Sequence, residues 1–222
     1  HGGIKAIYLT RVVHNVSAAK QRATKKAASS HFSDPYAHKD SILSFENFKL
    51  LRAVIDCISK CRSLEALYIV GIHLPHEFLT PLGNAIYQND SRLFRSLTIK
   101  NSNLHDEGFR LLTPYLAKSK IQVLVLENLH LTDASCNYIA SIIKAQEAAM
   151  DTLYWNSTLR IDSALDDGYV TTDTYGLQAL SLRDNKITSA GVIHVAKFLR
   201  SNQWLLAVNL ASNQIDVDGK DI

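Results

Sequence analysis

The side chains of this sequence that are best suited to chemistry form only incomplete sets. His73 and His76 flank Pro75, but no cysteine or carboxylate pair lies at the spacing that a zinc site needs. Asp166 and Asp167 lack the D-x-D-x-D-G spacing of a calcium-binding loop, so a solvated loop is expected there. We therefore predict no metal site and no cofactor.

The cysteines also argue against catalysis. Cys57, Cys61 and Cys136 are odd in number and form no CxxC pair, which favours a reducing compartment and buried thiols. Cys57 and Cys61 lie one helical turn apart, as small core residues often do. Because the sequence also lacks a nucleophile elbow and a phosphate-binding loop, we predict no catalytic residue and no enzyme activity.

The charge balance makes a nucleic-acid binder a poor hypothesis. The net charge is +3 and the isoelectric point is about 8.7, short of the strongly basic surface that such proteins carry. The basic cluster from Lys20 to Lys26 has no interleaved aromatic residue for base stacking, so a solvated loop is expected there. No apolar run reaches the length of a membrane span, and no signal segment opens the chain, so we predict a cytoplasmic protein.

An internal repeat determines which elements carry these residues. The pattern L-x-x-L-x-L-x-x-N-x-L is complete from Leu177 to Ile187 and again, 28 residues later, from Leu205 to Ile215. Looser copies share the apolar positions but not the asparagine; they begin at Leu64, Phe94 and Ile121, with a sixth and weaker start at Ile4. A fixed period of this length is typical of a solenoid built from strand-and-helix units.

The pattern has a physical basis. Its fourth and sixth positions point to the same side of a short strand and enter the core. The asparagine at position nine turns the chain inward and bonds backbone groups of the turn. Only Asn185 and Asn213 fill that position, where Ile72, Ser102 and Leu129 stand in the earlier repeats, so we expect those repeats to turn less regularly.

A helix is expected after each strand. Val192, Val195, Ala196 and Leu199 recur at helical spacing, as an apolar stripe that packs on the strands does. Pro81 and Pro114 fall inside two such segments, and an interior proline removes a hydrogen bond, so bent or shortened helices are expected there.

These observations predict an α/β fold: a leucine-rich repeat solenoid with a curved parallel sheet inside and helices outside. From about residue 60 to 222 it resembles the ribonuclease-inhibitor-like class of leucine-rich repeats. The alternative, a doubly wound sheet, lacks a glycine-rich phosphate turn. We treat residues 1–222 as a single domain.

Two segments interrupt the repeat. Residues 17–39 and 146–175 carry no strand motif, and the second, which contains Trp155, is predicted to be an inserted loop with at most one helical turn. Trp155 is either an anchor for a partner or packs the insertion onto the solenoid. The last repeat ends at Ile222 without its helix, so we expect the chain to be a fragment of a longer protein.

The second insertion points to a closer resemblance. Lys144-Ala-Gln146, Trp155 and Leu159-Arg160 fall between two repeats at spacings similar to those of the centrosomal protein of 78 kDa family. This resemblance implies a centriole or basal-body protein with a protein partner, such as a ubiquitin-ligase or centriolar component. Two alternatives stay open: a regulator of a small GTPase, resembling the leucine-rich repeat activator of Ran, and a sensor repeat domain of the innate-immune type.

Strand side chains that face the inner curve are the candidate binding residues. A parallel sheet holds such side chains in a rigid array, and aromatic and arginine residues favour a protein interface. We therefore predict a non-catalytic scaffold that binds a protein through the inner curve and the insertion. The predicted contact residues are Glu65, Tyr68, Arg95, Thr98, Lys100, Glu127, Arg183, Asn209 and Trp155.

Overall fold

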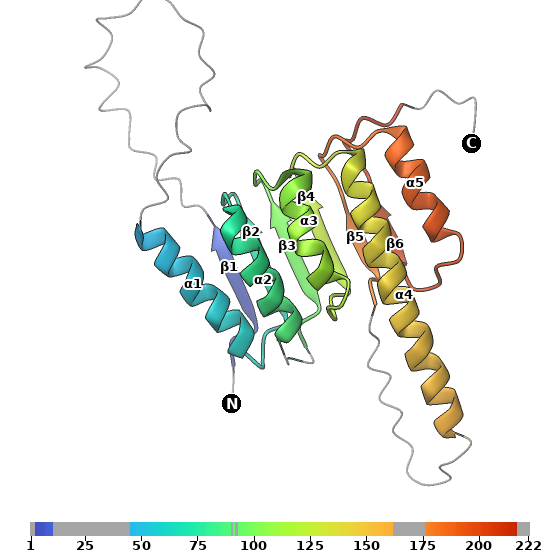
Figure 1. Ribbon diagram of the computed structural model, residues 1–222, viewed down its shortest axis with the longest axis horizontal. Helices are drawn as coiled ribbons and strands as arrows, with labels where there is room; N and C mark the ends of the chain where they lie inside the picture. Colours follow the sequence, from blue (N-terminus) through green and yellow to red (C-terminus); the bar gives the residue numbers. More distant parts are fainter. Residues whose placement is uncertain (1–2, 11–44, 90, 92, 162–175, 217–222) are drawn as a thin grey trace, which may run out of the picture.

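Strands and helices alternate along the chain, and the strands form one parallel sheet in chain order (Figure 1). The computed structural model describes residues 3–10, 45–89, 91, 93–161 and 176–216. The strands are β1 (Ala6–Thr10), β2 (Ala66–Val70), β3 (Ser96–Lys100), β4 (Val123–Glu127), β5 (Ala179–Ser181) and β6 (Ala207–Asn209). The helices are α1 (Phe45–Lys60), α2 (His76–Gln88), α3 (His105–Leu116), α4 (Asp133–Ile161) and α5 (Ser189–Leu199). All six predicted strands are confirmed, including the weak one after Ile4.

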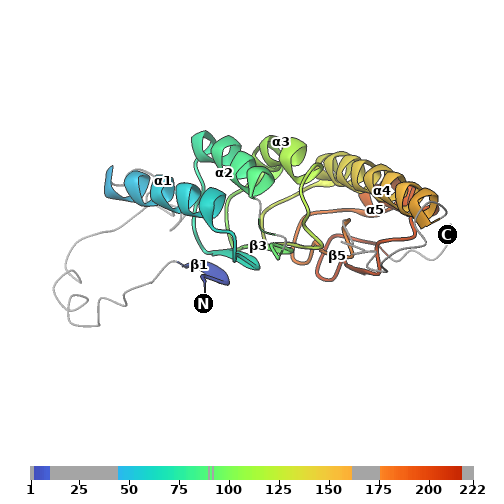
Figure 2. The same cartoon turned by 90° about the horizontal axis from the view of Figure 1, so that it is seen from below.

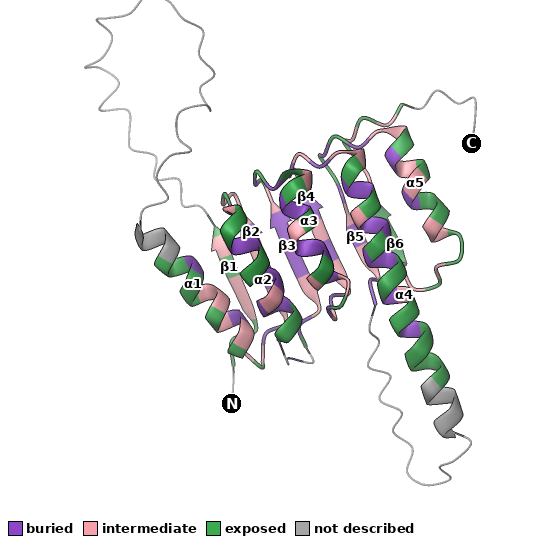
Figure 3. Ribbon diagram, viewed as in Figure 1, coloured by how far each residue is buried: buried purple, intermediate pink, exposed green. Residues whose placement is uncertain are grey.

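The helices lie on one face of the sheet and leave the other face without a helix, as Figure 2 shows for the described elements. The core fills the space between the two layers. Leu67 and Ile69 of β2 and Leu97 and Ile99 of β3, at positions four and six of the repeat, are completely buried toward the helices. Figure 3 shows buried residues along α2, α3 and the first half of α4. The predicted leucine-rich repeat architecture is confirmed.

Every full repeat turns at its eighth position with a left-handed residue. These residues have φ between 51° and 68°; they are Gly71, Asn101, Asn128, Asp184 and Ser212. Glycine, asparagine and aspartate adopt this conformation at the lowest cost. The expectation of irregular early turns is therefore wrong at this position. The expectation holds only for residues after the eighth position. There His105 and His130 are additional left-handed residues, which have no counterpart in the last two repeats.

Buried backbone groups inside the last turns bond to asparagine side chains, as predicted. Asn185 Oδ1 accepts hydrogen bonds from the backbone N–H of Leu129 and of Leu131, both at 3.1 Å. Its Nδ2 donates to the carbonyls of Leu126 and Leu182, both at 2.8 Å. In an earlier repeat, the hydroxyl of Ser102 donates to a carbonyl of the preceding repeat at 2.6 Å. One side chain thus joins the backbones of neighbouring repeats.

Aspartate and threonine side chains connect the helix starts of successive repeats. Asp106 of α3 accepts bonds from the backbone N–H (2.9 Å) and the hydroxyl (2.7 Å) of Thr132, and from the hydroxyl of Ser135. Asp133 of α4 accepts the same pair of bonds from Thr188, at 2.7 and 2.6 Å. Burial alone would raise the pKa of the Asp106 carboxyl, but these bonds outweigh it, so the pKa is lowered.

The predicted loop at 146–175 is wrong in its first half. Residues 146–161 continue α4, which is 29 residues long where α3 has 12 and α5 has 11. Residues 162–175 and the other predicted insertion, 17–39, lie outside the described part of the chain. The prolines do not shorten their helices, because Pro81 lies within the 13 residues of α2 and Pro114 near the end of α3. Among the described helices, none has the length and apolar character to cross a membrane.

Substituting Asn185 tests the role of this asparagine. In Asn185→Ala, the N–H groups of Leu129 and Leu131 and the carbonyl of Leu126 lose this partner, whereas the Leu182 carbonyl keeps its bond from Asn213. A buried unsatisfied group costs about 1–3 kcal/mol. We expect the free energy of unfolding in urea to fall by at least about 3 kcal/mol. Asn213→Ala removes the same residue type from the partly exposed last turn, so a loss of about 1 kcal/mol is expected. Equal losses would contradict this role.

The lowered pKa of Asp106 predicts a pH-dependent contribution to stability. Its carboxylate stabilises the folded state above the ordinary aspartate pKa of 3.8, and this contribution is lost as the pH falls below that value through the folded-state pKa. The difference in unfolding free energy between the wild type and Asp106→Asn should therefore be largest near pH 7 and shrink below about pH 4. If the difference in unfolding free energy stays constant between pH 7 and pH 3, the ionised Asp106 carboxylate does not make the predicted contribution to stability.

Candidate protein-binding face

The helix-free face of the sheet, here called the inner face, presents side chains in rows that run across the strands. The register pairs Ala6, Ala66, Ser96, Val123, Ala179 and Ala207 in a first row. Tyr8, Tyr68, Thr98, Val125, Ser181 and Asn209 form a second row. A third row holds Thr10, Val70, Lys100 and Glu127. These residues alternate with the buried leucines and isoleucines, so they point away from the helices.

Two tyrosines stack at the β1 end of the second row. The rings of Tyr8 and Tyr68 lie parallel within 1°, with centroids 4.5 Å apart, and Tyr8 is 65% exposed. A ring held in this way loses little conformational freedom when a partner covers it. Tyr68 was predicted as a contact residue and Tyr8 was not. The signal was available, because the motif beginning at Ile4 places Tyr8 at the same position as Tyr68.

A charged cluster lies in the middle of the inner face. Lys100 Nζ is 2.7 Å from Glu127 Oε2, and the hydroxyl of Ser181 donates to Glu127 Oε1 at 2.6 Å. Burial would raise the pKa of the Glu127 carboxyl, but Lys100, Ser181 and the nearby positive charge of Arg183 outweigh it, and the pKa is lowered. The structure therefore brings together three of the predicted residues: Lys100, Glu127 and Arg183.

Three other predicted residues lie differently from the expectation. Glu65 and Arg95 do not belong to the rows, because each precedes its strand by one residue; Ala66 and Ser96 take the inner-face positions instead. The alternation was counted from the wrong residue in these two repeats. Thr98 is on the inner face but only 5% exposed, so it offers little contact surface. Asn209 is exposed in β6, the last strand.

Trp155 lies apart from the inner face, in the second half of α4. Its side chain is 65% exposed, so the expectation that it packs the insertion onto the solenoid is not met. Tyr154 is 64% exposed beside it. In Figure 1 this half of α4 extends past the ends of the neighbouring helices.

The remaining candidates for chemistry stay separate. His73 and His76 are exposed, and the described residues include no group of three or more histidine, cysteine or acidic side chains placed to hold a metal. Cys57 and Cys61 are only half-buried, contrary to the expectation of buried thiols. Cys136 is buried, and burial raises the pKa of its thiol to about 11, which leaves it protonated and unreactive.

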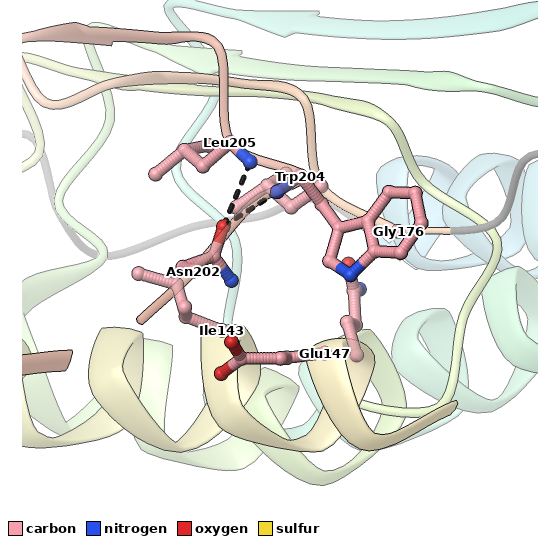
Figure 4. A pocket seen from close by; sticks show the side chains of 8 residues that line it. Ile143, Glu147, Gly176, Asn202, Trp204 and Leu205 are labelled. Atoms are coloured by element: carbon pink, nitrogen blue, oxygen red, sulfur yellow. Dashed lines mark hydrogen bonds between the residues drawn. The ribbon is translucent and has the colours of Figure 1, made fainter. Parts of the chain in front are cut away.

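A small pocket lies between α4 and the segment that leads into β6 (Figure 4). Trp204 and Glu147 line it, and Asn202 Oδ1 accepts hydrogen bonds from the backbone N–H of Trp204 (3.0 Å) and Leu205 (2.8 Å). Its space is about that of one water molecule, which excludes a substrate or cofactor. Among the described residues, the inner face is therefore the better candidate for a binding site.

Comparisons with known proteins agree with the fold. A family model described as "Leucine Rich repeat" matches residues 177–196 and 201–219. The Protein Cep78 homolog of Drosophila melanogaster is 25% identical over 166 residues, which are 72% of this chain and 19% of that protein. The ribonuclease inhibitor of Mus musculus is 29% identical over 165 residues, 72% of this chain and 35% of that protein. The chain thus spans about a fifth to a third of the length of these relatives.

A solved structure shows the same architecture. The fragment called Leiomodin-1 Actin-Binding Site 2 superimposes with a TM-score of 0.54, at 15% identity, over 77% of this chain and 82% of that one. At this identity the likeness concerns the fold alone.

A double-mutant cycle tests the charged cluster. Glu127 is 18% and Lys100 37% exposed in the side chain, so Lys100→Met and Glu127→Gln should couple by about 1 kcal/mol in unfolding free energy at pH 7. The coupling should vanish as the pH falls below the ordinary glutamate pKa of 4.5, because the lowered pKa of Glu127 stabilises the fold only while the carboxyl is ionised.

The pair Lys5–Glu65 supplies the matched control. It lies at 3.1 Å but is 72% and 43% exposed, so its cycle should give less than about 0.5 kcal/mol. Equal coupling in the two pairs would show that burial does not strengthen the Lys100–Glu127 interaction.

The repeat motif, the six-stranded parallel sheet and these likenesses converge: the chain has a leucine-rich repeat fold, and its sequence is similar to the ribonuclease inhibitor and to the Cep78 homolog.

Proposed function

We propose that this domain is a non-catalytic scaffold that binds a partner protein through its inner face. The observation that carries the proposal is the stacked tyrosine pair, with Tyr8 exposed and Tyr68 half-buried, on the same face as an ordered charged cluster. Interface hot spots are enriched in tyrosine, and an array that is already ordered loses little entropy when it binds. The buried Cys136 and the water-sized pocket offer no alternative centre for chemistry.

The likenesses support binding to proteins. The name of one relative states a protein target, because it is a ribonuclease inhibitor. That name concerns the relative and does not identify the target of this chain. A repeat domain whose inner face is rigid and uncovered by helices suits the same general role.

We propose further that the domain acts in the cytoplasm at the centrosome or basal body. The sequence likeness to the Cep78 homolog and the series Lys144, Gln146 and Trp155 favour this site. A ubiquitin-ligase or centriolar component is then the expected partner class. The alternative, regulation of a small GTPase, remains a prediction, which a GTPase stimulation assay with the purified chain tests.

Localisation of tagged protein in cells checks both parts of the proposal. The wild-type chain should overlap with a centrosomal marker, and Tyr8→Ser with Tyr68→Ser should reduce that signal at least about fivefold, because the aromatic contact is lost. Tyr87 of α2, 48% exposed on the helix side, supplies the control: Tyr87→Ser should localise like the wild type.

The outcomes separate the two parts. A wild-type chain spread through the cytoplasm would overturn the centrosomal assignment. Normal localisation of the double variant, with circular dichroism showing both variants folded, would overturn binding through the inner face.

A further inference from the structure

Two neighbouring rows of the inner face carry no charge. The first and second rows together hold only alanine, serine, threonine, valine, tyrosine and asparagine across all six strands. With strands about 4.8 Å apart, five strand steps make this strip about 24 Å long, and alternate residues on a strand make it about 7 Å wide. The tyrosine stack, with Tyr8 65% exposed, stands at its β1 end.

Charged residues border the strip on both sides. Lys5, Glu65 and Arg95 immediately precede β1, β2 and β3 along one border. The other border holds Lys100, Glu127 and Arg183, with Asp184 paired to Arg183 at 3.1 Å. Charges of both signs therefore stand on both borders, and Lys5 pairs with Glu65 at 3.1 Å.

An uncharged strip of these dimensions fits one face of an α-helix laid across the strands. A helix is about 10 Å wide with its side chains and has an apolar stripe along one side, and 24 Å corresponds to about 16 residues. Its charged flanks would meet the two charged borders, where opposite charges on the helix and the borders complement one another. An extended segment would turn every second side chain away from the strip.

We propose that the inner face binds an amphipathic helix of a partner protein, which crosses the strands with its apolar side on the first two rows and charged side chains toward the borders. The tyrosine stack anchors one end of this helix. The inference rests on the proposed function and specifies the shape of the bound element.

Site-specific photo-crosslinking measures the shape of that element. Benzoylphenylalanine replaces Ala66 of β2 or Ala207 of β6 in the full chain in cells, and mass spectrometry identifies the crosslinked partner residues. These positions are four strand steps apart, or about 19 Å. A helix that spans them advances about 13 residues, since each residue rises about 1.5 Å, whereas an extended chain advances about six.

Each outcome decides between the proposals. Crosslinks from both positions to one partner segment, about 13 residues apart, support the helix. Crosslinks about six residues apart, crosslinks to separate segments, or a crosslink from one position alone overturn the helix and leave binding through the inner face intact. Crosslinking no stronger than that from benzoylphenylalanine at Tyr87 contradicts both proposals.

A charge placed inside the strip gives an independent check. Ser96 lies in the middle of the first row, between Ala66 and Val123. We expect Ser96→Glu to reduce the crosslinking yield from Ala207 at least about tenfold, because an apolar helix face would bury the new carboxylate without a partner. Ser96→Ala should leave the yield unchanged. An equal yield in Ser96→Glu would overturn the apolar contact.

Discussion

The inner face depends on a backbone constraint: the chain must turn at the same position after every strand. A left-handed residue costs a side chain about 1–2 kcal/mol, and this protein places one at the eighth position of five successive repeats. Glycine, asparagine and aspartate fill four of those positions, and Ser212 fills the fifth. Because the turns coincide, each strand enters the sheet in the same register, and side chains from distant parts of the sequence form straight rows.

This constraint explains which parts of the fold the sequence predicts. The leucines and isoleucines at positions four and six are buried in the core. The six strands, and the side of each strand that packs against the helices, therefore follow from the spacing of these residues alone. The regularity of the early turns did not follow, because the asparagine at position nine was taken as the determinant. That asparagine bonds backbone groups, whereas the residue one position earlier sets the backbone direction. Gly71, Asn101 and Asn128 already carried the relevant signal.

Other features needed the three-dimensional arrangement. The second half of α4 was predicted to be a loop because it lacks a strand motif, although residues 133–161 contain no glycine or proline and several alanines, which favour a helix. The contact between Lys100 and Glu127 follows from register once the turns are known. The hydroxyl of Ser181 completes the Glu127 cluster across 54 residues of sequence, and no local pattern predicts that bond.

The two kinds of side chain on the inner face have different consequences for binding. Glu127 already has a partner for each carboxylate oxygen, so a bound protein gains little by replacing Lys100 or Ser181. The cluster therefore contributes to specificity. It fixes the positions of the Lys100 and Glu127 charges on the inner face, and a partner that places a like charge opposite either of them is disfavoured. Tyr8 has no such competing bond on its exposed surface, and burying it removes apolar area from water. Affinity is thus expected at the β1 end of the sheet and discrimination near β4.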